Sequence, residues 1–299
     1  MAERSIAELN SAISPANLAG RAPLLLAGVA FAVLFAEPAY LLARDWWNDP
    51  EAGHGLLLAP VSIWLVWRAG VRADAAPNRF LGIGLLVSAI LLRYVSGLAA
   101  EMFTMRFSMV LALAGLTTYY LGLRQLLSWW LPFTLFTLAI PLPEVIKSAM
   151  TLPLQFRASR MGAALLEWRN IPVELNGNVI QVPGRQLFVT EACSGLRSLT
   201  ALVSLGILMG ALWLRTPVAR ILVLAAAVGV ALMVNAVRVF MTGFLVVFVD
   251  PKLGEGFMHI TEGWLLFLVS LALTAGAAWL IGVIEGRLHR KRVAVEAAP

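Results

Sequence analysis

Three side chains that can act together in acyl transfer follow one another in the later part of the sequence: Cys193, Arg238 and His259. Cys193 is the only cysteine, which excludes an intrachain disulfide and a thiolate metal cluster. A thiol at a helix N-terminus beside cationic groups is favoured as a thiolate nucleophile. An imidazole can pair with that thiol and later protonate a leaving amine, and an arginine can hold oxyanion charge. The three residue types together therefore fit thiol-dependent cleavage of a bond whose leaving group is an amine.

The spacing of these residues along apolar runs predicts that they lie at a common depth in a membrane. About 20 helical residues cross a hydrocarbon core of about 30 Å, and each of the three lies about that far, or somewhat farther, from a basic residue that marks the cytoplasmic side. The separations are 22 positions from Cys193 to Arg215, 18 from Arg220 to Arg238 and 28 from His259 to Arg287. We therefore expect all three near the outer interface.

Each of these residues, taken singly, also has a purely structural interpretation. Cys193 could be an inert small residue at the start of a helix. Arg238 could extend its side chain to the lipid headgroups, and His259 could be a hydrogen-bonding group at the membrane interface. A shared depth favours a functional role, because a membrane protein has little reason to keep unpaired polar groups there.

The composition indicates an integral membrane protein. Of the 299 residues, 60% are hydrophobic and 13% charged, which excludes a disordered chain and an ordinary cytosolic enzyme. The net charge is +6, but the basic residues mark the ends of apolar runs, so we expect no nucleic-acid partner. Residues 1–20 are polar and 23–42 form an apolar run too long for a cleavable signal, so that run is expected to be a retained span.

The apolar segments predict an all-α membrane protein with about eight transmembrane helices. No internal repeat of the kind found in many transporters is visible. Basic residues in the short loops place both termini in the cytoplasm, which requires an even number of spans. The expected spans are 22–43, 55–70, 80–97, 102–122, 126–143, 194–214, 218–238 and 260–284.

A small extracytoplasmic cap is expected between the fifth and sixth spans, over residues 144–192. Residues 145–168 mix apolar and basic side chains, which is typical of an interfacial helix. Residues 173–192 carry Asn176 and Gly177 between β-branched runs, which predicts a β-hairpin. We expect this insert to belong to a single membrane-embedded domain that covers 1–299.

Four local motifs are more specific than the spacing. They are GHGLLLAPVSIWLVW (53–67), EACSGLRSL (191–199), NAVRV (235–239) and HITEGW (259–264). In this order, and in a multispan chain, they resemble the exosortase/archaeosortase family of membrane cysteine transpeptidases. The resemblance assigns the nucleophile to Cys193, the catalytic arginine to Arg238 and the catalytic histidine to His259.

The resemblance also implies a substrate and a location. Members of the family act on exported proteins that end in a Pro-Glu-Pro-type (PEP-CTERM) motif, a transmembrane helix and a basic cluster. They are thought to cleave near the motif and to transfer the protein to an acceptor. For this chain the resemblance implies the bacterial inner membrane, with the active site facing the periplasm. Neither the acceptor nor the oligomeric state follows from the residues.

Five further residues are weaker candidates for supporting or substrate-binding roles. Free backbone N–H groups at Ser194 and Gly195 could aid an oxyanion, although both are also ordinary cap residues. Arg197 could act on the thiol or on a substrate carboxylate. Asn235, three residues before Arg238, could orient that arginine, and His54 could line the same chamber. No cofactor is expected, and the three scattered histidines make a metal site implausible.

Two other functions remain open on the residues alone. A multispan transporter or channel would use the arginine and histidine in a permeation path and leave Cys193 incidental. A simple protease would resolve the thioester with water in place of an amine.

Overall fold

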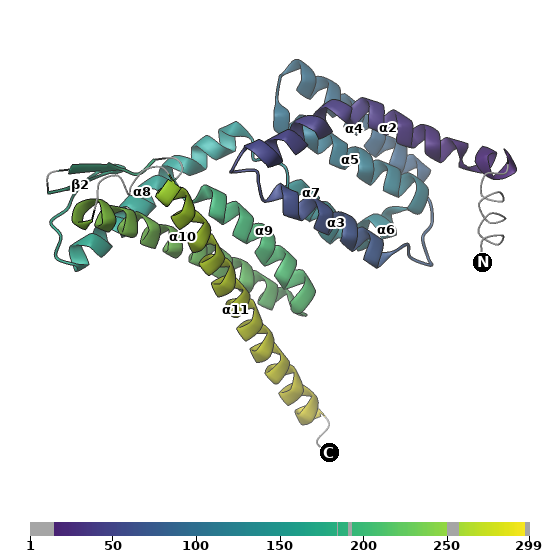
Figure 1. Cartoon of the computed structure of the whole chain (residues 1–299). Coiled ribbons are helices and arrows are strands. Elements are labelled where there is room, and N and C mark those ends of the chain that lie inside the picture. The colour runs from purple at the N-terminus through teal and green to yellow at the C-terminus, as the bar shows by residue number, and fades with distance from the viewer. Residues whose placement is uncertain (1–14, 184, 191–192, 250–256, 297–299) are drawn as a thin grey trace, which may run out of the picture. The chain divides into compact units, whose positions relative to one another are not determined.

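The structure is a computed structural model that describes residues 15–183, 185–190, 193–249 and 257–296. The side chains of 15–21, 257–262 and 291–296 lie outside this description. Within it the chain is mostly helical and forms two compact units (Figure 1). The first unit comprises Met1–Asn48 and Val71–Leu127, and the second comprises Asp49–Gly70 and Ser128–Pro299.

The first unit is built on three long helices, α2 (Pro15–Asn48), α4 (Arg79–Leu98) and α5 (Met102–Leu121), followed by the short α6 (Leu123–Ser128). Gly82 allows α4 and α5 to pack closely, because a Cβ there would lie 2.6 Å from the backbone of Tyr119. Two ion pairs connect α2 to the other helices: Glu37 with Arg93 at 2.7 Å and Asp45 with Arg106 at 2.5 Å. Arg106 is buried, so its pairing satisfies a charge that would otherwise be costly.

The second unit contains the helices that carry the candidate residues. These helices are α3 (Gly55–Ala69), α7 (Trp130–Leu138), α8 (Glu144–Trp168), α9 (Leu196–Trp213), α10 (Pro217–Phe248) and α11 (Phe257–Glu296). Helix α10 packs against α8, α9 and α11 (Figure 1). Glycines allow two of these close approaches, since Gly162 of α8 faces Val239 and Gly206 of α9 faces Ala227. The other helices around the candidate site, α8, α9 and α11, therefore all pack against α10.

A three-stranded antiparallel sheet stands between α8 and α9 in the sequence. Its strands are β1 (Glu174–Asn176), β2 (Val179–Val182) and β3 (Arg185–Phe188), in the order β1-β2-β3. The turn between β1 and β2 consists of Gly177 and Asn178, with Asn176 paired to Val179. Only the first of these turn residues has a positive φ, at 65°, as a type II′ turn requires. The sheet thus extends the expected hairpin by one strand.

Apolar residues of the sheet and of α8 and α10 form a common core. It includes the buried Leu166, Ile180 and Val239, with Cys193 packed against its edge. The expected helix at 145–168 is present as α8, which buries a face of small, apolar and polar side chains. Its expected place at the membrane interface stays a prediction.

In the part of the chain that the structure describes, five helices are long and apolar enough to cross a membrane: α2, α4, α9, α10 and α11. Three of the eight expected spans do not meet this standard and stay predictions. Helix α3 is apolar but has only 15 residues, and α5 has 20 residues but is less apolar. The expected span 126–143 divides at Trp129 into α6 and α7. Pro132 explains the break, because in a continuous helix its ring would clash with the carbonyl of Ser128.

Helix α10 ends later than the sequence predicts, which changes the position of Arg238 within the helix. The span was expected over 218–238, with Arg238 at its outer end, but the helix continues to Phe248. Ten further residues add about 15 Å of helix beyond Arg238. Arg238 is therefore an interior residue of a long helix and not a terminal one.

Candidate active site

Cys193 lies in a short turn between the sheet and α9 and is half-buried. Its backbone N–H donates to the carbonyl of Thr190 at 3.0 Å. The Thr190 hydroxyl also lies 3.7 Å from the sulfur, where it can donate a hydrogen bond. A thiolate at this position would therefore have a hydrogen-bond donor from its own loop.

The turn that holds Cys193 is fastened to α10 by Asn235. The side-chain amide of Asn235 donates to the Cys193 carbonyl at 2.9 Å, and Asn235 is itself buried. Gly195, the N-cap of α9, has a φ of 82°, and a Cβ there would lie 2.7 Å from Asn235 Cγ. Both the left-handed backbone and this close approach require glycine. Ser194 is buried, and its hydroxyl accepts from the N–H of Leu196 at 3.3 Å.

Arg238 lies three residues after Asn235 and faces the third element of the site. A Cβ on Gly263 of α11 would lie 3.4 Å from Nη2 of Arg238, so the guanidinium packs over the backbone of that helix. His259 is four residues before Gly263, and residues four apart share a helix face. The backbone of α11 thus carries His259 one turn from the arginine contact, while the His259 side chain lies outside the described residues.

A small cavity adjoins the cysteine. Its walls are mostly apolar and come from the sheet, the loop after it and α10. The lining residues are Ile180, Leu187, Phe188, Val189, Cys193, Val239 and Thr242. Among the described residues no charged side chain contributes to this lining, so this part of the cavity is suited to an apolar group beside the sulfur.

Two of the five weaker candidate residues, Arg197 and His54, lie in surroundings that differ from those of Cys193. Arg197 lies in the first turn of α9 and is exposed. His54 precedes α3, and its ring nitrogens lie 3.1 Å from the carbonyl oxygens of Glu51 and Leu138. His54 therefore connects the start of α3 to the end of α7. A place for it in a chamber around Cys193 stays a prediction.

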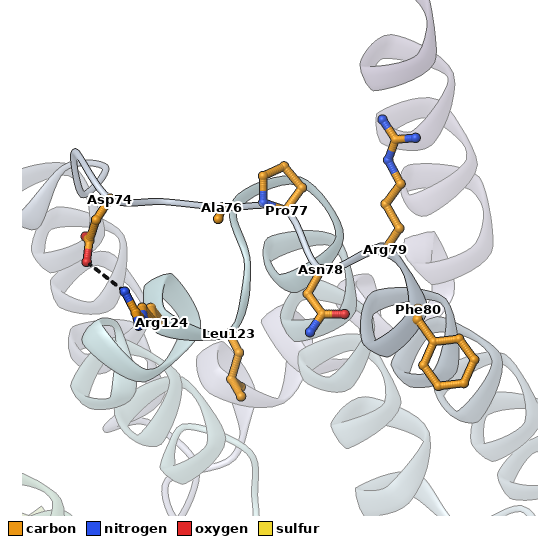
Figure 2. Close-up of a pocket in the computed structure, with 8 residues that line it drawn as sticks. All are labelled: Asp74, Ala76, Pro77, Asn78, Arg79, Phe80, Leu123 and Arg124. Atoms are coloured by element: carbon orange, nitrogen blue, oxygen red, sulfur yellow. Dashed lines mark ion pairs between the residues drawn. The ribbon is translucent and has the colours of Figure 1, made fainter.

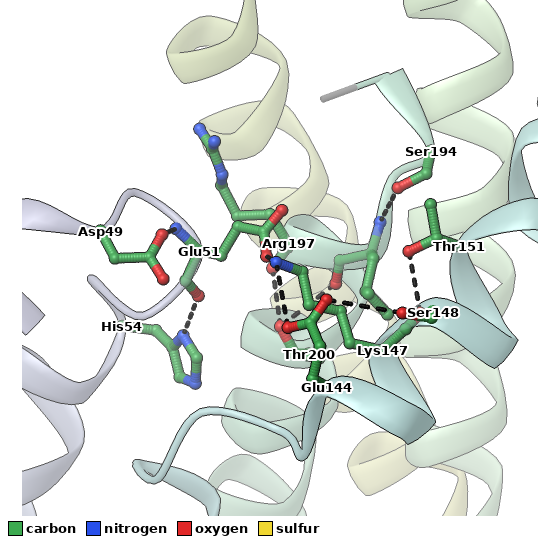
Figure 3. A network of polar contacts seen from close by, with 11 residues as sticks. Asp49, Glu51, His54, Glu144, Lys147, Ser148, Thr151, Ser194, Arg197 and Thr200 are labelled. Carbon is green, nitrogen blue, oxygen red and sulfur yellow. Dashed lines mark hydrogen bonds and ion pairs between the residues drawn. The ribbon is translucent and has the colours of Figure 1, made fainter. Parts of the chain in front are cut away.

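A polar network near His54 was missed by the sequence analysis (Figure 3). Lys147 of α8 pairs with Glu51 at 2.9 Å and lies 4.0 Å from Glu144. In the Lys147–Glu51 pair, both side chains are about three-quarters buried. The only sequence signal was an acidic residue close to His54, and nothing in the sequence predicted a partner 96 residues later.

A separate hollow in the first unit is lined by oppositely charged side chains (Figure 2). Asp74 in its lining pairs with Arg72 at 2.7 Å and lies 3.6 Å from Arg124. The hydrogen bond and charge of Arg72 lower the pKa of the Asp74 carboxyl, and Asp74 in turn raises the pKa of Arg72. These groups stay ionised and neutralise one another. Other lining residues are Ala76, Pro77, Asn78, Arg79, Phe80 and Leu123.

Among the residues that the structure describes, no group of three or more His, Cys, Asp or Glu side chains could hold a metal ion.

Comparison with known proteins identifies the family. A family model described as transmembrane exosortase (Exosortase_EpsH) matches residues 46–276, which include Cys193, Arg238 and His259. Comparison with curated proteins and with solved structures found no match. The match covers well over half of the chain and agrees with the multi-pass helical architecture. The chain is a multi-pass membrane protein that belongs to the transmembrane exosortase family.

Proposed function

We propose that the protein is a membrane-embedded cysteine transpeptidase or peptidase that cleaves the C-terminal sorting signal of exported proteins. The observation that supports this most directly is the hydrogen bond from Asn235 to the carbonyl of Cys193. This hydrogen bond connects the turn that holds Cys193 to helix α10, which carries Arg238 three residues after Asn235. The packing of Arg238 over Gly263 then extends the same framework to α11, the helix of His259.

In the proposed reaction, the Cys193 thiolate attacks the carbonyl carbon of the scissile peptide bond. The carbonyl π electrons move to the oxygen, and the Arg238 guanidinium stabilises the resulting oxyanion. The tetrahedral intermediate collapses with cleavage of the C–N bond. His259, as the imidazolium, gives its proton to the leaving amine, and a thioester remains on Cys193.

The thioester is resolved by a second nucleophile. His259, now neutral, accepts a proton from an incoming amine or water as it attacks the thioester carbonyl. The C–S bond breaks and Cys193 leaves as the thiolate. An amine acceptor yields a new amide and water yields a free carboxylic acid, so the product mass distinguishes transfer from hydrolysis.

The substrate class follows from family membership. We propose that it comprises exported proteins with a Pro-Glu-Pro-type (PEP-CTERM) motif, a transmembrane helix and a basic cluster at the C-terminus. The protein would act as one domain in the bacterial inner membrane, with cytoplasmic termini and a periplasmic site. The basic short loops support that orientation. A substrate helix beside the enzyme would bring the motif to the outer interface.

The experiment that tests this function compares the wild type with Cys193→Ala in cells. Each is co-expressed with an exported reporter whose tail comes from a sorting-signal protein of the same genome. We expect the reporter to lose its tail only with the wild type. Equal membrane levels of the two enzymes, measured by immunoblot, provide the control for insertion. Tail loss with Cys193→Ala, or an intact cognate tail with the wild type, would reject the proposal.

A further inference from the structure

The cavity beside Cys193 has features of a preformed side-chain pocket. Ile180 of β2 is fully buried, and Val189 and Val239 are nearly so. Ile180 pairs with Leu187 of β3, and Val189 donates its N–H to the carbonyl of Asn178 at 2.9 Å. Sheet pairing therefore holds one wall of the pocket, and the long helix α10 holds the other.

The size of the cavity limits what it can accept. Its volume is about 30 Å³, which is close to the space that one water molecule occupies in the liquid. A methyl group fits a space of that size, whereas a leucine or phenylalanine side chain would extend out of it or displace its walls. Displacement is costly here because the walls belong to a packed core.

The chemistry of the lining favours an apolar occupant. Apart from the thiol, the one polar side chain among the described lining residues is the Thr242 hydroxyl, and the remaining walls that the structure describes are aliphatic or aromatic. A charged group in this cavity would lose its hydration without gaining a counter-ion from the lining. Thr242 lies four residues after Arg238, so the pocket and the proposed oxyanion group are on the same helix.

We infer that this cavity receives a small apolar side chain, of about the size of alanine, from the substrate residue that adjoins the scissile bond. The inference rests on the proposed function, because it assigns the cavity to a peptide that Cys193 attacks. It makes Leu187 and Thr242 specificity-determining residues. Leu187 limits the pocket from the side of the sheet, and Thr242 limits it from α10.

The test measures a substrate preference and not an overall rate. Cleavage of the cognate reporter is first mapped by mass spectrometry. Reporters are then made with Gly, Ala, Leu or Phe on each side of the cleaved bond. We expect the wild type to prefer Ala over Phe at least tenfold at one of the two positions, since a single methylene in an apolar pocket changes selectivity about tenfold or more.

Two variants alter the pocket in opposite directions. Leu187→Ala enlarges it, and the Leu/Ala cleavage ratio should rise about tenfold. Thr242→Leu fills it, and cleavage of the Ala reporter should fall toward that of the Gly reporter. The matched control is Leu175→Ala, which shortens a leucine of the same sheet that does not line the cavity. This control should keep the wild-type ratio.

The outcomes separate this inference from the proposed function. Processing that persists in Cys193→Ala overturns both. Processing that depends on Cys193, but with an unchanged Leu/Ala ratio in Leu187→Ala and an unchanged Ala/Gly ratio in Thr242→Leu, overturns only the pocket assignment. Because each result is a ratio within one variant, a lower yield of folded protein does not obscure it. Labelling of Cys193 by a maleimide verifies that the turn is intact in each preparation.

Discussion

The amide of Asn235 and the carbonyl of Cys193 form a hydrogen bond of 2.9 Å across 42 residues of sequence. The bond joins the turn before α9 to the middle of α10. Because Asn235 is buried, the interaction is shielded from competing water. The carbonyl belongs to the same residue as the proposed nucleophile, so the backbone from which the thiol extends is held in place.

Replacement of Asn235 should impair the chemical step more than substrate binding. We expect Asn235→Ala to lower kcat about 10- to 100-fold with little change in KM, since a misplaced reacting group costs rate on this scale. Asn235→Asp should behave similarly at neutral pH, because a carboxylate cannot donate to a carbonyl. Purified enzyme and a cognate peptide provide the measurement. An unchanged kcat in both variants would remove the positioning role.

Gly195 should tolerate no side chain while Asn235 is present. Gly195→Ala places a Cβ 2.7 Å from Asn235 Cγ and retains a left-handed φ, so we expect strong loss of activity. In the double variant with Asn235→Ala the contacts with Cγ and Nδ2 are removed, while the Cβ of residue 235 stays 3.0 Å away and about 1–2 kcal/mol of backbone strain remains. Thermal unfolding in detergent should therefore show non-additive effects. Additive effects would contradict the described contact. Gly276→Ala, with no atom within 4 Å of the new Cβ, is the matched control.

Gly263 should limit the position of the Arg238 guanidinium. Gly263→Ala brings the new Cβ only to van der Waals distance and should retain activity. Gly263→Leu should displace the guanidinium and lower kcat at least tenfold, as expected when an oxyanion group moves. Gly276→Leu is the control on the same helix, at a position with open space. Equal activity of the two leucine variants would argue against a functional Arg238.

The Glu51–Lys147 pair should stabilise the packing of the start of α3 against α8. A double-mutant cycle with Glu51→Ala and Lys147→Ala should give a coupling of about 1 kcal/mol, near the upper end for partly exposed pairs. Added salt should reduce the coupling. The measurement is thermal unfolding of the four proteins in detergent. A coupling indistinguishable from zero at low salt would show that the pair is not energetically significant.

Glu101 should make stability depend on pH at the start of α5. Burial acts to raise its pKa, but hydrogen bonds from Thr104 and Phe103 outweigh burial and lower the pKa of the carboxyl. A depressed folded-state pKa contributes stability that is fully present above the unfolded value of about 4.3. That stability is lost as the pH falls through the folded-state pKa. Glu101→Gln should thus be less stable than the wild type at pH 7. The difference should disappear in acid, and a difference independent of pH would contradict this account.

The sequence predicts where the helices and strands lie better than it predicts the residues at which they end. Apolar runs gave helices at each expected span, because burial or membrane insertion determines such segments locally. The break at Trp129 has a local cause in Pro132, since a proline inside an apolar run favours a kink or a break in the helix. The continuation of α10 to Phe248 shows why a basic residue alone does not mark a helix end. A charge inside an apolar helix can be accommodated by a neighbouring backbone, as Arg238 is by Gly263.

The candidate site was predictable in its residue types but not in its contacts. The expected role of Asn235 was to orient Arg238, since spacing along a helix reveals only near neighbours. Its described partner is the carbonyl of Cys193, and no sequence pattern specifies a tertiary contact of that kind. The need for glycine at position 195 likewise depends on a side chain from another helix.

The most direct test of the thiol mechanism is detection of the acyl-enzyme. Purified wild type is mixed with the cognate sorting-signal protein, quenched in acid and analysed by intact mass and by peptide mapping. The mechanism predicts a thioester on Cys193 that neutral hydroxylamine releases, and no adduct with Cys193→Ala. A tail that is cleaved without any adduct on Cys193, and equally well by Cys193→Ala, would contradict it.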